Sequence, residues 1–217
     1  DADEFRWGGR YLWRIRQRFA PHNVYTDFDA LRALARQVGA GDGPIEPAWQ
    51  FADDPHEVLR PEGGVIEVPY RLNGVVYRYD RATNSYLRSV TGERAQRDQE
   101  TGERVAPKNV VVPLVRFAPL RDGTDKHRLE ADVVGSGVAY IASNGATIKG
   151  TWRKASIAAP TLLFDADGNP VTLTRGQTFV QVVPTGTDLV IRDGKVPPRD
   201  PRPAGAGSPL SRGPTTR

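Results

Sequence analysis

Residues 65–79 read Val-Ile-Glu-Val-Pro-Tyr-Arg-Leu-Asn-Gly-Val-Val-Tyr-Arg-Tyr, and this stretch decides the fold class. Two segments rich in β-branched and aromatic residues, 65–72 and 75–79, flank the dipeptide Asn73-Gly74. Asparagine and glycine both tolerate the positive φ angles that the central residues of a type I′ hairpin turn require. The stretch therefore predicts two antiparallel strands joined by a two-residue turn.

The same pattern recurs along the rest of the chain. A second pair, Asn144-Gly145, separates β-rich segments at 138–141 and 147–152. Pro113 interrupts a valine-rich segment at 109–117 and predicts an edge strand or a bulge there, because proline cannot donate to a strand ladder. Further strands are expected at 85–90, 129–134, 162–164, 171–173, 178–183 and 188–192. Of these, 162–164 and 171–173 are expected to form a hairpin around the turn at 165–169.

One segment has helical periodicity. Its apolar residues form a single stripe at Phe28, Leu31, Leu34, Ala35 and Val38. Thr26 is expected to cap the helix, with Asp29 as the acidic half of a capping box, and Gly39 to end it. The chain is therefore predicted to be α+β and β-dominated, a largely antiparallel sheet or sandwich with one main amphipathic helix and a disordered C-terminal tail.

Three parts are expected along the chain. Residues 1–25 are predicted to be the end of an amino-terminal domain or an extended arm, because between Tyr11 and Arg18 apolar side chains alternate with arginines. Residues 26–195 hold the helix and the β-rich domain. Residues 196–217 have the basic, Pro- and Gly-rich composition of a disordered tail.

Composition excludes several classes of protein. The 217 residues carry a formal net charge of +4 and include no cysteine, which excludes disulfides, a cysteine nucleophile and a lipid-modified cysteine within this chain. The positive charge is mostly arginine, much of it near the two ends, and so small a surplus is only weak evidence for nucleic acid, which is not expected as a partner. No apolar run reaches the ~20 residues of a transmembrane helix.

The candidate ligand-binding site is the stretch Ala-Pro-His-Asn-Val-Tyr-Thr at 20–26 with Arg18 just before it. Arg18 can hold a carboxylate or a phosphate, His22 can act as an acid or a base, and Asn23 and Tyr25 can form hydrogen bonds to a ligand. In the alternative interpretation the loop uses these groups on itself, with the polar side chains satisfying its own backbone.

Neither a metal nor a cofactor is expected. Asp122, Asp125 and His127 lie close together in sequence, but a metal site needs three or four convergent ligands and the chain has only three histidines. The sequence also lacks a phosphate-binding Walker loop and a dinucleotide-binding glycine motif.

In their order, several short blocks resemble the YerB-type bacterial lipoproteins, a family of unknown function. These blocks are APHNVYT at 20–26, YRYD at 77–80, YLR at 86–88, NVVV at 109–112, GSGVAY at 135–140, GTW at 150–152 and GQT at 176–178. The resemblance implies an exported, extracytoplasmic protein of the cell envelope, anchored in the membrane by a lipidated cysteine in an N-terminal segment that is missing here. It implies no reaction, cofactor or catalytic residue.

Two functions are open at this point. The first is a non-enzymatic module that binds a cell-wall polymer or an envelope protein through Arg18, His22, Asn23 and Tyr25. The alternative is an enzyme that modifies an envelope glycan or a phosphate-linked polymer, with His22 as the acid–base group and Arg18 holding negative charge.

Overall fold

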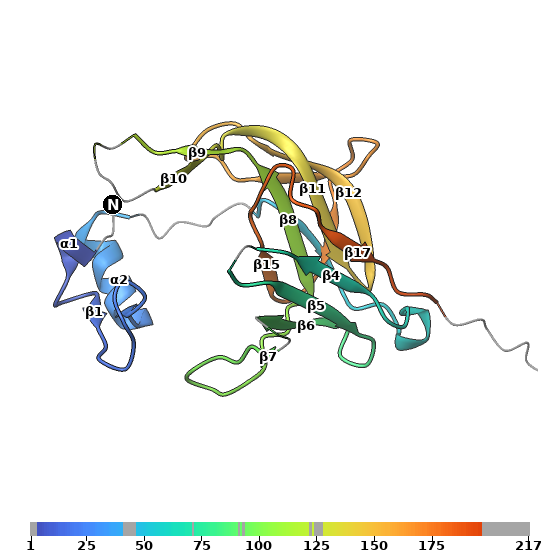
Figure 1. The fold of residues 1–217 in the computed structure, drawn as a ribbon, viewed down its shortest axis with the longest axis horizontal. Coiled ribbons are helices and arrows are strands. Elements are labelled where there is room, and N and C mark those ends of the chain that lie inside the picture. The colour runs from blue at the N-terminus through green and yellow to red at the C-terminus, as the bar shows by residue number, and fades with distance from the viewer. Residues whose placement is uncertain are drawn as a thin grey trace, which may run out of the picture. The chain divides into compact units, whose positions relative to one another are not determined.

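The computed structural model describes residues 4–40, 47–70, 72–90, 92, 94–121, 123 and 128–196. The chain divides into two compact units, residues 1–46 and 47–217 (Figure 1). This division falls after the main helix, whereas the sequence grouped that helix with the β-rich segment. The expected disordered tail lies outside the described residues, apart from its first residue.

The first unit contains two helices and one short strand pair. Its elements are α1 (Glu4–Trp7), β1 (Trp13–Arg14), β2 (Val24–Tyr25) and α2 (Phe28–Gln37). The two strands are antiparallel, with Trp13 opposite Tyr25. The alternating segment before residue 20 thus contributes a two-residue strand rather than a long one.

The N-terminal cap of helix α2 lies one residue later than predicted. The carboxylate of Asp27 accepts from the backbone N–H of Ala30 at 2.7 Å and caps the helix. Thr26 is not the cap, and its hydroxyl instead donates to the Tyr11 carbonyl at 2.7 Å. The predicted end is confirmed, since Gly39 follows the helix with a φ of +70°.

The second unit is built from strands and one 3₁₀ turn, η1 (Glu57–Leu59). In chain order the strands are β3 (Gln50–Ala52), β4 (Val65–Val68), β5 (Val75–Asp80), β6 (Ser85–Val90), β7 (Arg94–Ala95), β8 (Asn109–Val115), β9 (Phe117–Pro119), β10 (Leu129–Ala131), β11 (Gly135–Ser143), β12 (Ala146–Lys154), β13 (Leu162–Phe164), β14 (Thr172–Thr174), β15 (Thr178–Val180), β16 (Val183–Pro184) and β17 (Val190–Arg192). The predicted β-dominated fold is confirmed.

Two large sheets organise this unit (Figure 1). The six-stranded sheet has the order β13-β12-β11-β8-β15, with β16 also paired to β8, and the five-stranded sheet has the order β17-β4-β5-β6-β7. Nearly all pairs are antiparallel, and only β14 with β3 and β15 and β16 with β8 are parallel. The expected largely antiparallel sandwich is therefore observed.

The sheets share one core. Val110 and Val112 of β8 and Ala142 of β11 pack in a cluster with Tyr77, Tyr86 and other buried side chains of the five-stranded sheet. A second cluster lies on the opposite face of the six-stranded sheet and includes Val111, Val115, Ala139, Ile141, Trp152 and Leu163. Because side chains alternate along a strand, β8 supplies both clusters.

One predicted hairpin turn is confirmed and the other is wrong. Asn144 and Gly145 have φ angles of +53° and +74°, and Ser143 pairs with Ala146, as in a type I′ turn. Asn73-Gly74 is not a two-residue turn, because Val68 pairs with Val75 and residues 69–74 form the connection. Pro69 follows β4 directly and has no N–H to continue the ladder.

Strand β8 is a central strand, so the edge predicted from Pro113 is wrong. Proline is tolerated there because the ladder on one side is interrupted. On that side the backbone N–H of Asn109 donates to the Gln177 carbonyl. Pro113 lies four residues further along the strand, so its backbone nitrogen faces the same side. Strand β15 pairs with residues 109–111 and β16 with 114–115, which leaves a gap at Pro113.

The predicted hairpin of 162–164 with 171–173 forms next to its turn, where the Val171 N–H donates to the Leu163 carbonyl at 3.0 Å, but its two strands do not pair along their length. The N–H of Asp165 donates to the Asn169 carbonyl at 2.9 Å, and Phe164 forms an isolated bridge with Pro170. Strand β14 instead pairs in parallel with β3, which the sequence did not predict as a strand.

Buried polar side chains tie the strands together. Asn109 is fully buried; its amide nitrogen donates to the Thr174 carbonyl at 2.8 Å and to the Thr178 hydroxyl at 3.0 Å. Its amide oxygen accepts from the N–H of Thr174 at 2.9 Å and from the Ser143 hydroxyl at 2.9 Å. This one side chain therefore joins β8, β11, β14 and β15.

A neighbouring network is centred on Asn84, which is also fully buried. Its amide nitrogen donates to Asn144 at 2.8 Å and to the Asp54 carboxylate at 3.0 Å, and its amide oxygen accepts from the Tyr79 hydroxyl at 2.6 Å. The ammonium of Lys108 donates to Asp54 at 2.6 Å. The connections after β5 and β11 are thus held to the loop before η1.

We expect Asn109→Ala to lower the free energy of unfolding by about 3 kcal/mol, because the Thr174 N–H and carbonyl would stay buried without their partner. Urea denaturation followed by tryptophan fluorescence measures this loss. Asn169→Ala, in the exposed turn at 165–169, is the matched control and should change stability by less than about 0.5 kcal/mol. Equal losses in the two variants would contradict the assignment.

Asp54 should make stability depend on pH. The hydrogen bond from Lys108, together with that from Asn84, lowers the pKa of this carboxyl in the folded protein. Its contribution is therefore complete above the unfolded pKa of about 3.9 and is lost as the pH falls through the lower folded value.

The variant Asp54→Asn should accordingly lose less stability than the parent chain between about pH 7 and about pH 3 in urea titrations. Asp167→Asn, in an exposed turn, is the control and should keep the parent's pH dependence. Identical pH dependence in the parent and in Asp54→Asn would show that the hydrogen bonds to Asp54 contribute nothing.

Candidate functional site

The loop at 18–26 lies in the first unit, where Asn23 supports the local fold. Asn23 is 9% exposed, and its amide nitrogen donates to the Ile15 carbonyl at 3.0 Å. Its amide oxygen accepts from the Arg14 guanidinium at 2.6 Å. Arg14 also holds the Glu4 carboxylate through Nε and Nη2. Asn23 therefore connects the loop to β1 and, through Arg14, to α1.

The other three predicted site residues are placed differently. Arg18 and His22 are exposed, and the His22 backbone N–H donates to the Phe19 carbonyl at 3.1 Å. Tyr25 is half-buried in β2. The peptide bond between Ala20 and Pro21 is cis. The structure thus brings Asn23 into the unit's interior and leaves Arg18 and His22 on the surface.

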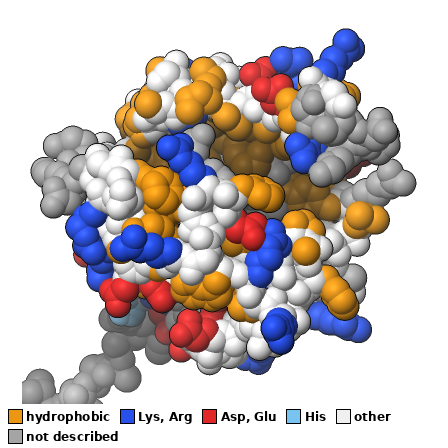
Figure 2. All heavy atoms as spheres, turned by 90° about the vertical axis from the view of Figure 1, so that its left-hand side faces the viewer, with side chains coloured by type: hydrophobic (Ala, Val, Ile, Leu, Met, Phe, Trp, Pro, Cys, Tyr) orange, Lys and Arg blue, Asp and Glu red, His pale blue; other side chains and the backbone are white. Residues whose placement is uncertain are grey.

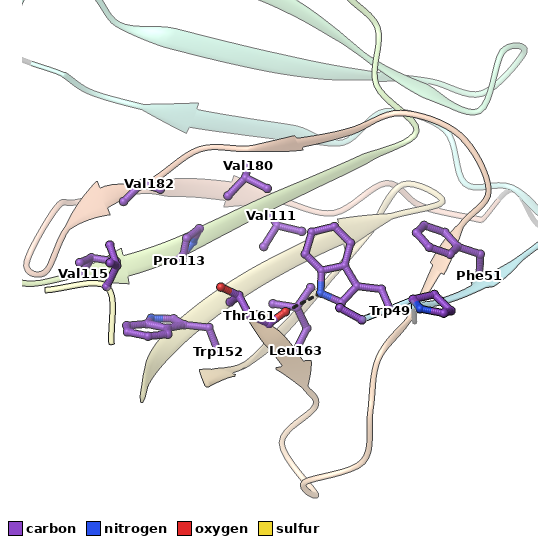
Figure 3. A pocket seen from close by; sticks show the side chains of 13 residues that line it. Trp49, Phe51, Val111, Pro113, Val115, Trp152, Thr161, Leu163, Val180 and Val182 are labelled. Carbon is purple, nitrogen blue, oxygen red and sulfur yellow. Dashed lines mark hydrogen bonds between the residues drawn. The ribbon is translucent and has the colours of Figure 1, made fainter. Parts of the chain in front are cut away.

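A better-formed cavity lies in the second unit, on the outer face of the six-stranded sheet (Figure 3). It has a volume of about 410 Å³, within the range of about 300–1,000 Å³ for ligand pockets. We call it the apolar pocket. It is lined by Pro47, Ala48, Trp49, Phe51, Val111, Pro113, Val115, Val133, Trp152, Thr161, Leu163, Val180 and Val182.

Strand β8 forms the middle of the apolar pocket. Figure 3 shows Val111 and Pro113 along this strand, with Val180 and Val182 to one side and Trp152 to the other. The pocket exists because the second face of the sheet is covered only in part, by Trp49 and the loops around β3 and β14. The remaining opening exposes apolar side chains.

Both tryptophans in the wall have satisfied indole nitrogens. Trp49 Nε1 donates to the Thr161 carbonyl at 2.8 Å, and Trp152 Nε1 donates to the Leu114 carbonyl at 3.0 Å. These bonds fix the two rings and use their only polar groups. Among the described residues that line the pocket, Thr161 alone has a polar side-chain atom other than these. The walls therefore offer contact to carbon rather than hydrogen bonds.

The rim of the apolar pocket is open to solvent. Phe51, Val180 and Val182 are 40%, 44% and 38% exposed. On the face of the molecule drawn in Figure 2, hydrophobic side chains lie at the surface among charged side chains of both signs. Exposed apolar groups around a formed cavity are typical of a surface that meets another molecule.

Sequence reasoning missed this pocket. Trp49 and Trp152 are far apart in the chain, and nothing in either segment shows that they meet. One available signal was the apolar run from Val110 to Val115 in β8, because a strand that is apolar on both faces needs partners on both.

No group of three or more His, Asp or Glu side chains suited to a metal ion occurs in the described part of the chain. Asp122, Asp125 and His127 lie outside that part. In the described helices, none is long and apolar enough to cross a membrane.

Fold and pocket together define a class of protein: a two-sheet β domain with a ligand-sized apolar pocket on the outer face of one sheet. Residues 66–180 match the family described as "Protein of unknown function (DUF3048) C-terminal domain". The chain belongs to this family, and the resemblance noted from the sequence blocks is confirmed.

Two matches are informative, and both are to YerB of Bacillus subtilis. "Putative lipoprotein YerB" of Bacillus subtilis is 26% identical over 185 residues, which are 81% of this chain and 52% of the relative. The crystal structure of the YerB protein from Bacillus subtilis superposes with a TM-score of 0.71 at 22% identity, covering 88% of this chain and 63% of that one. The chain thus spans about half the length of its curated relative, and the structural match supports the fold.

We expect Asn23→Ala to lower the local stability of the first unit and His22→Ala to leave this stability unchanged. The Ile15 N–H donates to the Asn23 carbonyl at 2.9 Å and reports on the β1–β2 region. Loss of the Asn23 side-chain bonds should speed exchange of this amide about tenfold in a hydrogen-exchange NMR measurement, equivalent to ~1.4 kcal/mol. Faster exchange in His22→Ala alone would instead assign the supporting role to His22.

Proposed function

We propose that this chain is a non-enzymatic binding module of an extracytoplasmic lipoprotein. In this proposal its apolar pocket receives apolar side chains of a protein partner. The observation that carries it is the pocket itself, which combines a ligand-sized volume with walls made of carbon and a partly exposed rim.

The composition of the walls favours a protein partner over a cell-wall polymer. A sugar ring brings several hydroxyl groups, and each loses its water on entering a cavity unless a polar group replaces it. The apolar pocket has few such groups, because its indole N–H groups are bound to backbone carbonyls. Aromatic or aliphatic side chains need no such replacement and are the usual anchors of protein interfaces.

Extracytoplasmic location, with membrane anchoring through a lipidated segment, is part of the same proposal. Its support is the name of the Bacillus subtilis relative, which is a lipoprotein by that name. A partner would then be an envelope protein, since this is the class of protein that such a module meets.

The loop at 18–25 is proposed as a second contact. Arg18 and His22 are exposed and offer charge and hydrogen bonds to a partner, while Asn23 supports the loop and Tyr25 lies in β2. We favour this proposal over an enzyme that uses His22, because its neighbour Asn23 serves the fold by accepting from Arg14, which also pairs with Glu4.

Site-specific photo-crosslinking tests the proposed function. Benzoylphenylalanine in place of Val182 should give an adduct in the producing cells that proteases degrade and glycan hydrolases do not. The matched control is the same group in place of Val190, a strand valine that is also 38% exposed but lies outside the apolar pocket.

Adding Val180→Asp to the chain should reduce the adduct at position 182 about tenfold, because the partner would have to bury a carboxylate. Equal adducts at 182 and 190 would overturn the proposal, as would insensitivity to Val180→Asp. An adduct that glycan hydrolases degrade would assign the pocket to a polymer instead.

A further inference from the structure

A second cavity of the β-rich unit contains a buried arginine. This cavity has a volume of about 650 Å³ and is lined by residues of the five-stranded sheet and of the segments after β4 and β15, among them Tyr70, Val75, Arg88, Gln96 and Gln181. We call it the Arg88 pocket. Arg88 comes from the middle of β6 and is only 7% exposed.

The partners of Arg88 within the described residues are neutral. Its Nε donates to the Tyr77 hydroxyl at 3.0 Å, and its Nη2 lies 3.4 Å from the amide oxygen of Gln181. Its guanidinium lies over the Phe179 ring at 4.6 Å and near the Tyr77 ring at 5.6 Å. These groups position and partly solvate the cation, but none carries negative charge.

Tyr77 does not supply the missing charge. Burial raises the pKa of Tyr77 to about 12, although its hydrogen bond from Arg88 acts in the opposite direction. The phenol is therefore neutral at physiological pH. Arg88 forms no ion pair with a carboxylate in the part of the chain that the structure describes.

A buried guanidinium without an anion is unusual, because removing a charge from water costs several kcal/mol unless an opposite charge compensates. Hydrogen bonds and contact with aromatic ring faces offset only part of this desolvation free energy. An oxyanion that entered the Arg88 pocket would provide the compensation, and a guanidinium binds carboxylates and phosphates through paired N–H donors.

Another buried polar group of the same cavity lacks a hydrogen-bond partner among the described residues. The amide oxygen of Gln96 is buried and accepts no hydrogen bond in the described structure. Gln96 lines the Arg88 pocket. A buried acceptor of this kind is satisfied by a ligand group that donates, such as a hydroxyl or an N–H.

From these two observations we infer that the Arg88 pocket binds a small molecule or a chain end that carries an oxyanion beside a hydrogen-bond donor. The oxyanion, a carboxylate or a phosphate, lies against Arg88, and the donor, a hydroxyl or an N–H, lies against Gln96. Val75 and Val90 provide apolar contact for the carbon skeleton between them.

This site is distinct from the apolar pocket. Val180 and Val182 line the apolar pocket, whereas Gln181 between them lines the Arg88 pocket. The inference therefore goes beyond the proposed function and does not depend on it. Val182→Asp, which impairs the apolar pocket, should leave anion binding at Arg88 unchanged.

Three probes of similar size test the inference. Glucuronate offers a carboxylate and hydroxyls, glucose 6-phosphate a phosphate and hydroxyls, and glucose is the neutral control. Two-dimensional ¹⁵N NMR titrations of the whole chain at constant ionic strength should show saturable shifts at the Gln96 and Gln181 side-chain amides with at least one anionic probe, and none with glucose. The probe that binds more tightly identifies the oxyanion.

Substitutions assign the binding to the pocket. Arg88→Gln should weaken binding of the preferred anion at least about tenfold, corresponding to ~1.4 kcal/mol. Gln96→Leu leaves the charge in place and should weaken binding about threefold or more through loss of the acceptor. Arg94→Gln, an exposed arginine of the same sheet, is the matched control and should bind as the parent does.

If Arg88→Gln does not fold, the test is the comparison of anion binding by Gln96→Leu with anion binding by the control Arg94→Gln. The inference is overturned if neither anion produces shifts beyond those of glucose. It is also overturned if Arg94→Gln weakens binding as much as the pocket variants do, since the probes would then respond to surface charge alone.

Discussion

Strand β8 is the constraint on which the rest of the structure depends, because it is paired on both edges and apolar on both faces. Val110 and Val112 face the five-stranded sheet, and Val111 and Val115 face the outer cluster. A strand of this kind needs cover on each side, since every exposed valine forfeits burial worth about 25 cal/mol per Å². The five-stranded sheet covers one face, where Val110 and Val112 are fully buried and Leu114 is partly buried. The outer face is covered by shorter pieces, and the apolar pocket is the part that they leave open.

Polar contacts determine how these layers stay in register. Asn109 stands at the start of β8 and bonds to groups of β11, β14 and β15, which links the edge of the sheet to its centre. Asn84 links the turns after β5 and β11, because its side chain forms hydrogen bonds with Tyr79, Asn144 and Asp54. Gly145 completes this arrangement. Its N–H donates to the Tyr86 hydroxyl at 3.0 Å, and a Cβ at this position would lie 2.7 Å from the Tyr79 ring. The family-like blocks at 77–80 and 86–88 thus supply groups to these networks.

The sequence predicted local structure better than it predicted partners. The turn at Asn144-Gly145, the helix end at Gly39 and most strands followed from residue types whose backbone preferences are local. The errors at Asn73-Gly74 and Pro113 came from long-range pairing, because the register of β4 with β5 and the gap beside β8 depend on segments far away in the chain. The same limit applies to the sites. Asn23 could be predicted as one of four site residues because polar residues surround it in the sequence, but its hydrogen bond from Arg14 could not. The two pockets bring together segments that no sequence periodicity connects.

The segment from Phe179 to Val182 links the two proposed sites. Its side chains alternate, so that Phe179 and Gln181 lie on the side of Arg88 while Val180 and Val182 lie in the apolar pocket. The segment is held to β8 through β15 and through the Gln181 N–H, which donates to the Val111 carbonyl at 2.8 Å. On the Arg88 side, Tyr70 accepts from the Gln181 amide at 2.6 Å and donates to the Val182 carbonyl at 2.7 Å. A ligand in either pocket would therefore restrain the same few backbone groups. The conformational entropy of these groups would be lost when the first ligand binds, and the second ligand would not have to reduce it again.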